Sequence, residues 1–263
     1  MECKICEKND VLESFTKDVI KCIKCNSMYQ TVSKDNEIPA VVSGTKNLKS
    51  SAQKKNSQLV AQSYLQYLKG KTDVNFENAL DIGCGFGHFV EELNKIGINA
   101  IGIESDKNTV ENAKAHVNYG FFDESYDSTK KYDLISINQT LYYFEDTFAI
   151  LEKISKLLKP NGIIMIATVN TESSFREKHK IWTQGCKICL GNEVWKNFDK
   201  FGLTCIDITS YDDNLFIDFF LNKSNNMSKT KFLKNSLFYV SKIKKLFVLN
   251  DNGINNFILL KKS

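Results

Sequence analysis

One glycine-rich stretch constrains the fold of this 263-residue chain more than any other feature. It runs Asn78-Ala-Leu-Asp-Ile-Gly-Cys-Gly-Phe-Gly-His-Phe-Val90, an apolar run that ends in an acid and is followed by three glycines at alternate positions. The pattern predicts a buried strand, a tight loop and the first turn of a helix. Because glycine has no Cβ atom, such a loop can take positive φ angles and let a ligand lie against its backbone N–H groups.

The spacing of these glycines separates two kinds of cofactor. A dinucleotide fingerprint needs Gly-x-Gly-x-x-Gly, and its third glycine would fall at His88. The observed order, Gly83, Gly85 and Gly87, instead resembles motif I of the class I S-adenosylmethionine (SAM) methyltransferases. A second acid, Glu104, ends the next predicted strand, where it is placed to accept both hydroxyls of a ribose.

Two Cys-x-x-Cys pairs near the N-terminus predict a metal site. Cys3 and Cys6 are followed, after fifteen residues, by Cys22 and Cys25. This spacing is typical of two zinc knuckles facing one tetrahedral site, and four thiolates leave no open position for water. We expect a structural Zn²⁺ that supplies the folding free energy of a ribbon at residues 1–32. Unliganded cysteines in a frayed terminus are the alternative.

The rest of the chain predicts a linker and one α/β domain. Residues 33–57 are polar and are interpreted as the linker, and residues 58–263 as the domain. Alternating strands and helices favour a Rossmann-like, doubly wound, mostly parallel sheet. In the ribbon we expect strands at 11–15, 18–21 and 27–32. In the domain we expect strands at 78–82, 99–104, 117–122, 132–137, 163–169, 203–209 and 256–260, and helices at 57–70, 87–96, 106–115, 144–158 and 193–201.

Composition and charge exclude little. Hydrophobic residues make up 42% of the chain, and the net charge of +4 comes with lysine spread along the whole length. Nucleic-acid binding is therefore permitted but not indicated. The N-terminus lacks the apolar core of a signal peptide, and no run reaches the roughly 18 apolar residues of a spanning helix. We expect a cytoplasmic protein. The lysine-rich segment at 227–249 is interpreted as a solvated helix face rather than a contact for anionic lipid or phosphate.

Over most of its length the chain resembles a family of bacterial and archaeal class I methyltransferases with an N-terminal four-cysteine zinc-binding segment. The likeness rests on the two knuckles and on Leu80–Gly87, Gly102–Glu104, Tyr132–Ile137, Leu157–Gly162 and Phe198–Gly202. Many members act on nucleotide-linked sugars or other small molecules of surface-polysaccharide and natural-product pathways. The resemblance implies SAM as cofactor and a phosphate- or sugar-bearing acceptor, methylated on oxygen, or less readily on carbon or nitrogen, in capsule or other surface-glycan synthesis.

The resemblance also implies roles for single residues. Asp81 and the three glycines would surround the methionine part of SAM, and Glu104 would hold the ribose. Asp123, after the third strand, would bind the adenine amine, with a helix cap as the alternative reading. Asn138 and Gln139, after the fourth strand, would line the methyl side. These positions all fall beyond the carboxyl ends of strands, where ligands bind in such sheets.

The acceptor side departs from the family pattern. Many relatives have Leu-Glu-His after the fourth strand, whereas this chain has Leu141-Tyr-Tyr143 and so lacks that histidine base. Methyl transfer is an in-line displacement that chiefly needs alignment, and a strong base matters only for an acceptor that is not already nucleophilic. Tyr143 would line the acceptor pocket, pass a proton or serve in packing, and His179, after the fifth strand, is the best candidate base. His88 either touches the cofactor or is an exposed first-turn residue.

Three further hypotheses stay open. An RNA methyltransferase also combines a zinc ribbon with this fold, although Ile137-Asn-Gln-Thr140 lacks the Asn/Asp-Pro-Pro-Tyr/Phe element of base amino methylation. A non-catalytic scaffold is the second, and the intact acid and glycine motifs speak against it. Cys186-x-x-Cys189 has no free partner pair, so unligated thiols are preferred over a second metal half-site or a redox pair.

Overall fold

The computed structural model describes residues 2–31, 51–73, 75–114, 116–123, 126, 129–183, 185–212, 248–249 and 252–263. Most of the predicted linker, the apolar run at 215–221 and nearly all of the lysine-rich segment at 227–249 lie outside these residues. Among the described residues, no helix combines the length and apolar character that crossing a membrane requires.

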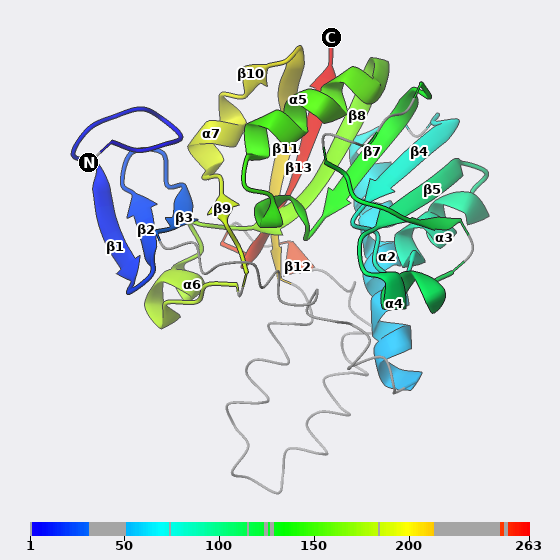
Figure 1. The fold of residues 1–263 in the computed structure, drawn as a ribbon, viewed down its shortest axis with the longest axis horizontal. Helices are drawn as coiled ribbons and strands as arrows, with labels where there is room; N and C mark the ends of the chain where they lie inside the picture. The colour runs from blue at the N-terminus through cyan, green and yellow to red at the C-terminus, as the bar shows by residue number, and fades with distance from the viewer. Residues whose placement is uncertain are drawn as a thin grey trace, which may run out of the picture.

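A large mixed sheet forms the body of the described chain (Figure 1). Its strands lie in the order β10-β11-β13-β8-β7-β4-β5-β6, and β12 pairs with β11. The five strands from β6 to β8 are parallel, while β13 runs antiparallel to both β8 and β11. The bounds are β4 Asn78–Ile82, β5 Asn99–Glu104, β6 Val117–Tyr119, β7 Tyr132–Asn138, β8 Leu158–Val169, β10 Asp199–Lys200, β11 Leu203–Asp212, β12 Val248–Leu249 and β13 Asn255–Lys262.

Helices cover both faces of this sheet, as a doubly wound fold requires. Successive residues of a strand point to opposite faces. On one face Leu134 and Met165 pack with helices α2 (Ser51–Lys71) and α3 (His88–Lys95). On the other, Ile135 and Ile164 pack with α5 (Thr147–Leu157) and α7 (Asn192–Lys196). The predicted fold class is therefore confirmed, and the parallel strands end at one common edge.

A small second sheet contains the N-terminal ribbon. Strands β1 (Leu12–Thr16), β2 (Val19–Cys22) and β3 (Met28–Gln30) form the antiparallel meander that the sequence predicts. A fourth strand, β9 (Ile188–Cys189), adds to β3 from far along the chain. No sequence pattern predicts this pairing, which joins the ribbon to the segment that follows β8.

Several helix boundaries differ from the predictions. The helix expected from residue 57 begins at Ser51. Helix α4 (Lys107–Glu111) is shorter than expected, and the side chain of Asp106 caps it by accepting from the N–H of Thr109 at 3.1 Å. Helix α5 begins after Asp146, whose carboxylate accepts from the N–H of Ala149 at 2.9 Å. Residues before this cap form the short 3₁₀ helix η1 (Leu141–Tyr143).

The second half of the helix predicted at 193–201 is wrong. Helix α7 ends at Lys196, and β10 then pairs with β11 as a tight hairpin. At the turn, Phe201 and Gly202 take φ angles of 58° and 67°. Positive φ at both central residues is what a two-residue hairpin turn needs and what a helix forbids.

Candidate active site and metal centre

The glycine loop follows β4 at the carboxyl edge of the sheet. All three glycines have positive φ angles, of 67°, 55° and 74° for Gly83, Gly85 and Gly87. A Cβ atom on Gly83 would lie 2.4 Å from Thr140, and one on Gly87 would lie 2.4 Å from Val117. A Cβ on Gly85 would meet nothing within 4 Å. Packing thus accounts for the outer two glycines, whereas Gly85 faces open space from which a ligand can approach its backbone.

Glu104, at the end of β5, is fixed beside this loop. Its carboxylate is buried, and Oε2 accepts from the N–H of Gly85 at 2.9 Å. The other oxygen, Oε1, accepts from the N–H groups of Ser105 and Asp106 at 2.8 and 2.9 Å. Hydrogen bonds from backbone donors hold such a carboxylate in one orientation. It is therefore a rigid acceptor next to the open side of the loop.

Asp81 is a second buried acid at the same edge. Its side chain accepts from Ser136 Oγ at 2.6 Å, across the β4–β7 pair in which the two residues face each other. Burial raises the pKa of Asp81 to about 7, the Ser136 hydrogen bond lowers it, and the charge of Glu104 raises it. Within the described part of the chain no Lys, Arg or His makes an ion pair with either acid. Two buried acids without a cation fit a ligand that brings a positive charge and hydroxyls.

Asn138 and Gln139 extend this edge past β7. Both polar atoms of the Asn138 side chain are enclosed and have no hydrogen-bond partner among the described residues. Buried amides are nearly always hydrogen-bonded, so this one fits a polar ligand group. Gln139 takes a φ of 54°, and its amide accepts from Tyr142 OH at 3.0 Å and donates to Tyr211 OH at 3.1 Å. A left-handed, non-glycine residue of this kind is characteristic of functional sites.

Two tyrosines of η1 form an apolar surface beside Gln139. The rings of Tyr142 and Tyr143 meet edge to face, with centroids 4.6 Å apart. They pack with Val169 and with the indole of Trp182. Burial raises the pKa of Tyr143, and it raises that of Tyr142 well above its ordinary value. Both hydroxyls therefore stay protonated near neutral pH and serve as hydrogen-bond donors rather than bases.

The remaining predicted residues lie farther out. Asp123 is exposed beyond β6, and its backbone carbonyl accepts from Lys153 Nζ. His179 is exposed at the end of α6 (Ser174–His179), with its ring 4.5 Å from that of Phe175. His88, the first residue of α3, is half-buried, and burial lowers its pKa. The roles predicted for Asp123 and His179 stay predictions.

The four N-terminal cysteines converge on one point. Their Sγ atoms all lie within 4.8 Å of one another, with Cys3 and Cys25 at 3.8 Å and Cys6 and Cys22 at 3.7 Å. A tetrahedral ion with Zn–S bonds of about 2.3 Å places its sulfurs about 3.8 Å apart. The N–H groups of Lys24 and Cys25 point at Cys22 Sγ from 3.4 and 3.5 Å. The geometry and the donor chemistry both fit Zn²⁺.

Cys186 and Cys189 do not belong to this cluster. They are buried beside Tyr142 and Val169, and among the described residues no third metal-binding side chain is grouped with them. Burial raises the pKa of Cys186, which keeps the thiol protonated and unreactive.

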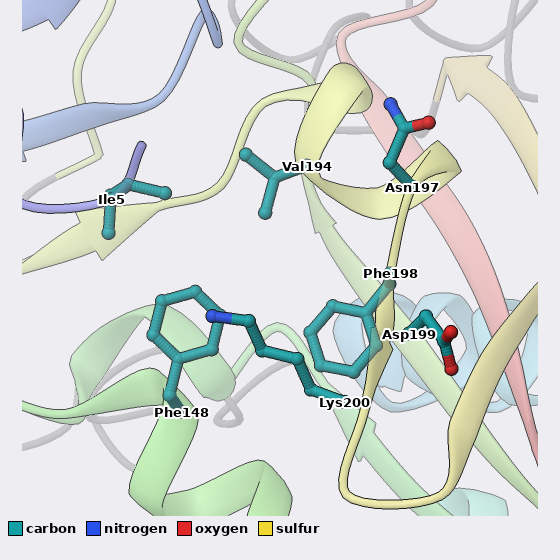
Figure 2. Close-up of a pocket in the computed structure, with 7 residues that line it drawn as sticks. All are labelled: Ile5, Phe148, Val194, Asn197, Phe198, Asp199 and Lys200. Atoms are coloured by element: carbon teal, nitrogen blue, oxygen red, sulfur yellow. The ribbon is translucent and has the colours of Figure 1, made fainter. Parts of the chain in front are cut away.

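A shallow hollow of 170 Å³ lies at the junction of the ribbon and the large sheet (Figure 2). Ile5 of the first knuckle lines one side, and Phe148, Val194 and Phe198 of the larger body line the other. Lys200 Nζ lies 4.7 Å above the Phe148 ring. None of the predicted site residues borders this hollow, so it is separate from the carboxyl edge.

Sequence reasoning missed three residues of the carboxyl edge. Ser136 orients Asp81, Tyr211 holds Gln139, and Trp182 packs on the η1 tyrosines. Only Ser136 left a signal, as a lone hydroxyl in the apolar run of β7. Tyr211 and Trp182 reach the site through tertiary folding alone.

Known proteins match parts of this chain in sequence. The methyltransferase-domain family matches residues 52–195. A ubiquinone biosynthesis O-methyltransferase of Rhodopseudomonas palustris is 30% identical over 99 residues, and one of Pelagibacter ubique is 34% identical over 99 residues. Each match covers 35% of this chain and spans only 39% and 41% of the two relatives, about two-fifths of their length.

Solved structures share the fold. A SAM-dependent methyltransferase of Thermotoga maritima superposes with a TM-score of 0.53 at 17% identity, over 78% of this chain and 90% of that one. A plantazolicin methyltransferase bound to S-adenosylhomocysteine (SAH) gives 0.50 at 18% identity, over 88% and 91%. A [4+2]-cyclase also gives 0.53 at 15% identity, over 77% and 81%, so the fold by itself does not fix the reaction.

Proposed function

Because the chain belongs to the family of methyltransferase domains, we propose that it transfers the methyl group of SAM to an oxygen of a small acceptor. The observation that carries this proposal is the pair of buried, cation-free carboxylates of Asp81 and Glu104 around the open backbone of Gly85. Oxygen as the methylated atom is supported by the relatives, which are O-methyltransferases of ubiquinone biosynthesis.

The residues of the carboxyl edge fit SAM group by group. Asp81 would face its positive charge, and Gly83, Gly85 and Gly87 would leave room for the methionine part. Glu104 would accept the ribose hydroxyls from its fixed position, and Asp123 would accept the adenine amine. Asn138 and Gln139 would line the methyl side. When bound, SAM supplies a sulfonium-activated methyl group, and the chain has only to align an acceptor with it.

The acceptor side offers alignment more than proton removal. Tyr143 stays protonated, so it would donate a hydrogen bond to an acceptor or pack against its ring, whereas the hydroxyl of Tyr142 already donates to Gln139. We keep His179 as the candidate base, since α6 follows the carboxyl end of β8 in the chain. An acceptor whose hydroxyl ionises readily would need no base at all.

The acceptor class remains the one that the sequence resemblance implies: a nucleotide-linked or carbohydrate-type molecule of surface-glycan synthesis. The partly exposed ring of Tyr143, which packs against Tyr142, would suit the flat face of a sugar or another ring. RNA is less well supported, because the free edge of β3 is taken by β9 and the ribbon packs against the larger body. The division into ribbon (1–32), linker (33–57) and catalytic domain (58–263) is part of this proposal.

We also propose that Cys3, Cys6, Cys22 and Cys25 bind a structural Zn²⁺. Four thiolates close the coordination sphere, so the ion would have no part in the reaction. Its role would be to hold the two knuckles of the ribbon together.

Calorimetric titration with SAM tests the cofactor assignment. We expect micromolar binding by the wild type and at least a tenfold loss for Glu104→Gln, which weakens an acceptor of the ribose hydroxyls. Glu111→Gln, at an exposed acid of α4, is the matched control and should bind normally. Equal affinity in all three proteins would refute the proposed role of Glu104, and no binding by the wild type would favour a scaffold.

A further inference from the structure

The ribbon and the acceptor side of the proposed active site are joined by direct contacts. We propose that the ribbon is the structural support of the acceptor side, and that Trp182 is the positioning residue that couples them. This inference rests on the proposed function in one respect only, namely that the η1 tyrosines face the acceptor.

The first connection is a shared sheet. Strand β9 pairs with β3 in the register Met28 to Cys189 and Tyr29 to Ile188. The N–H of Gln30 donates to the carbonyl of Lys187 at 3.0 Å. The N–H of the same Lys187 donates to the carbonyl of Tyr142 at 2.7 Å. One residue thus links the ribbon on one side to η1 on the other.

The second connection is the indole of Trp182. On one side it packs against Phe15, Val19 and Met28, which form an apolar cluster of the ribbon strands. On the other it packs against the cluster that holds Tyr142 and Val169. Its Nε1 is enclosed and has no partner among the described residues, so apolar packing on both sides is what holds the ring.

The third connection is a close backbone contact at the second knuckle. A Cβ atom on Gly191 would lie 1.9 Å from the carbonyl oxygen of Cys25, so only glycine fits there. The N–H of Gly191 donates to Ser27 Oγ at 3.0 Å, and Cys25 Sγ lies 3.3 Å from the same hydroxyl. The knuckle is therefore pressed against the start of α7.

These contacts separate two parts of the site. The ribbon has little core of its own, so loss of the metal would loosen Phe15, Val19 and Met28. Trp182 and η1 would lose their support with them. Asp81 and Glu104 would not, because their hydrogen-bond partners, Ser136 and Gly85, belong to the large sheet and its loop. Loss of the metal should therefore loosen the acceptor side and leave the cofactor side unchanged.

Hydrogen exchange measured by mass spectrometry tests the coupling without any acceptor. The metal-loaded full chain is compared with the same chain after chelation, with metal content measured in both. We expect peptides covering 139–143 and 185–190 to exchange at least tenfold faster after chelation, and peptides covering 80–87 and 100–105 to change less than twofold. Unchanged exchange at 139–143 in metal-free protein would overturn the proposal.

Two variants separate positioning by Trp182 from general loss of structure. Trp182→Ala, with metal retained, should accelerate exchange at 139–143 as chelation does, while Trp182→Phe should restore most of the protection. SAH should bind both variants within twofold of the wild type. If Trp182→Ala protects 139–143 as well as the wild type, Trp182 has no positioning role. If SAH binds neither the wild type nor the variants, the proposed function fails. The exchange result still decides whether the ribbon and the acceptor side are coupled.

Discussion

Asp81 is a residue whose ionisation opposes folding. Burial raises its pKa to about 7 in the folded chain, from an ordinary 3.8. Between these values the folded chain holds a proton that the unfolded chain has lost, so stability falls as pH rises and the loss is complete above pH 7 or so. This difference in pKa lowers the free energy of unfolding by at most roughly 4 kcal/mol. A buried acid whose ionisation lowers stability this much is expected where a positively charged ligand offsets the loss on binding.

Asp81→Asn should therefore stabilise the protein and weaken its ligand. We expect a higher melting temperature at pH 8 and little change near pH 4, because asparagine never ionises. SAM affinity should fall at least tenfold, and the wild type should lose affinity between pH 7 and pH 5.5 while the variant shows no such trend. Thermal unfolding and calorimetry across this range measure both effects. A variant that is less stable than the wild type at pH 8 would show that another group stabilises the ionised form of Asp81.

Tyr143 and His179 make competing predictions about proton removal. The hydroxyl of Tyr143 stays protonated, so Tyr143→Phe should keep kcat within about fivefold of the wild type. His179→Gln should reduce kcat by roughly 100-fold or more with unchanged SAH affinity if it is the base, since general base catalysis contributes on that scale. A steady-state assay with the identified acceptor distinguishes them. The opposite pattern would transfer the proton-carrying role to Tyr143.

At the scale of elements, a pair of glycines offers a matched test of how the ribbon docks. Gly191→Ala places a methyl group against the backbone of Cys25, whereas Gly70→Ala places one in open space on helix α2. We expect Gly191→Ala to lower the melting temperature by several degrees, equivalent to roughly 1–3 kcal/mol for a forced backbone shift. Gly70→Ala should raise it slightly, because alanine favours helix.

Differential scanning calorimetry of the two variants decides this point. Equal melting temperatures in Gly191→Ala and the wild type would mean that the knuckle can move away without cost, and the close contact would then carry no docking role.

Local patterns predicted the elements whose formation depends on local residues. Strands β4 and β5 match the predicted ranges, and helix α3 starts one residue after the predicted start. The acid, the glycines and the apolar run are sufficient to predict these elements, because all three lie in one short segment of the sequence. Glu104 was likewise found because it ends an apolar strand, although its hydrogen bond to Gly85 was not foreseeable.

Local sequence patterns did not predict contacts between residues that lie far apart in the chain. Strand β9 is two residues long, which is too short to show the alternation of apolar and polar residues that predicts a strand. Its pairing with β3 depends on where the ribbon meets the larger body. The same is true of Gln139, whose two tyrosine partners come from η1 and β11. The cofactor side was therefore predicted more completely than the acceptor side, which is assembled from distant segments.

At the scale of the whole molecule, the ribbon is joined to the large sheet at the acceptor side. The large sheet has β13 antiparallel between β8 and β11, and the chain shares its overall fold with solved methyltransferases. The ribbon adds to it through β9, Trp182 and Gly191. Metal removal should accordingly leave the main unfolding transition in place and abolish protection of the acceptor side.

Transfer of a labelled methyl group is the decisive test of whether this protein methylates a small acceptor. The purified protein is incubated with methyl-labelled SAM and fractionated extract of its source cells, before and after nuclease treatment, beside Asp81→Asn as the inactive control. We expect label in small, nuclease-resistant molecules with the wild type and at least tenfold less with the variant. Label in large RNA that nuclease destroys, or equal labelling by both proteins, would contradict it.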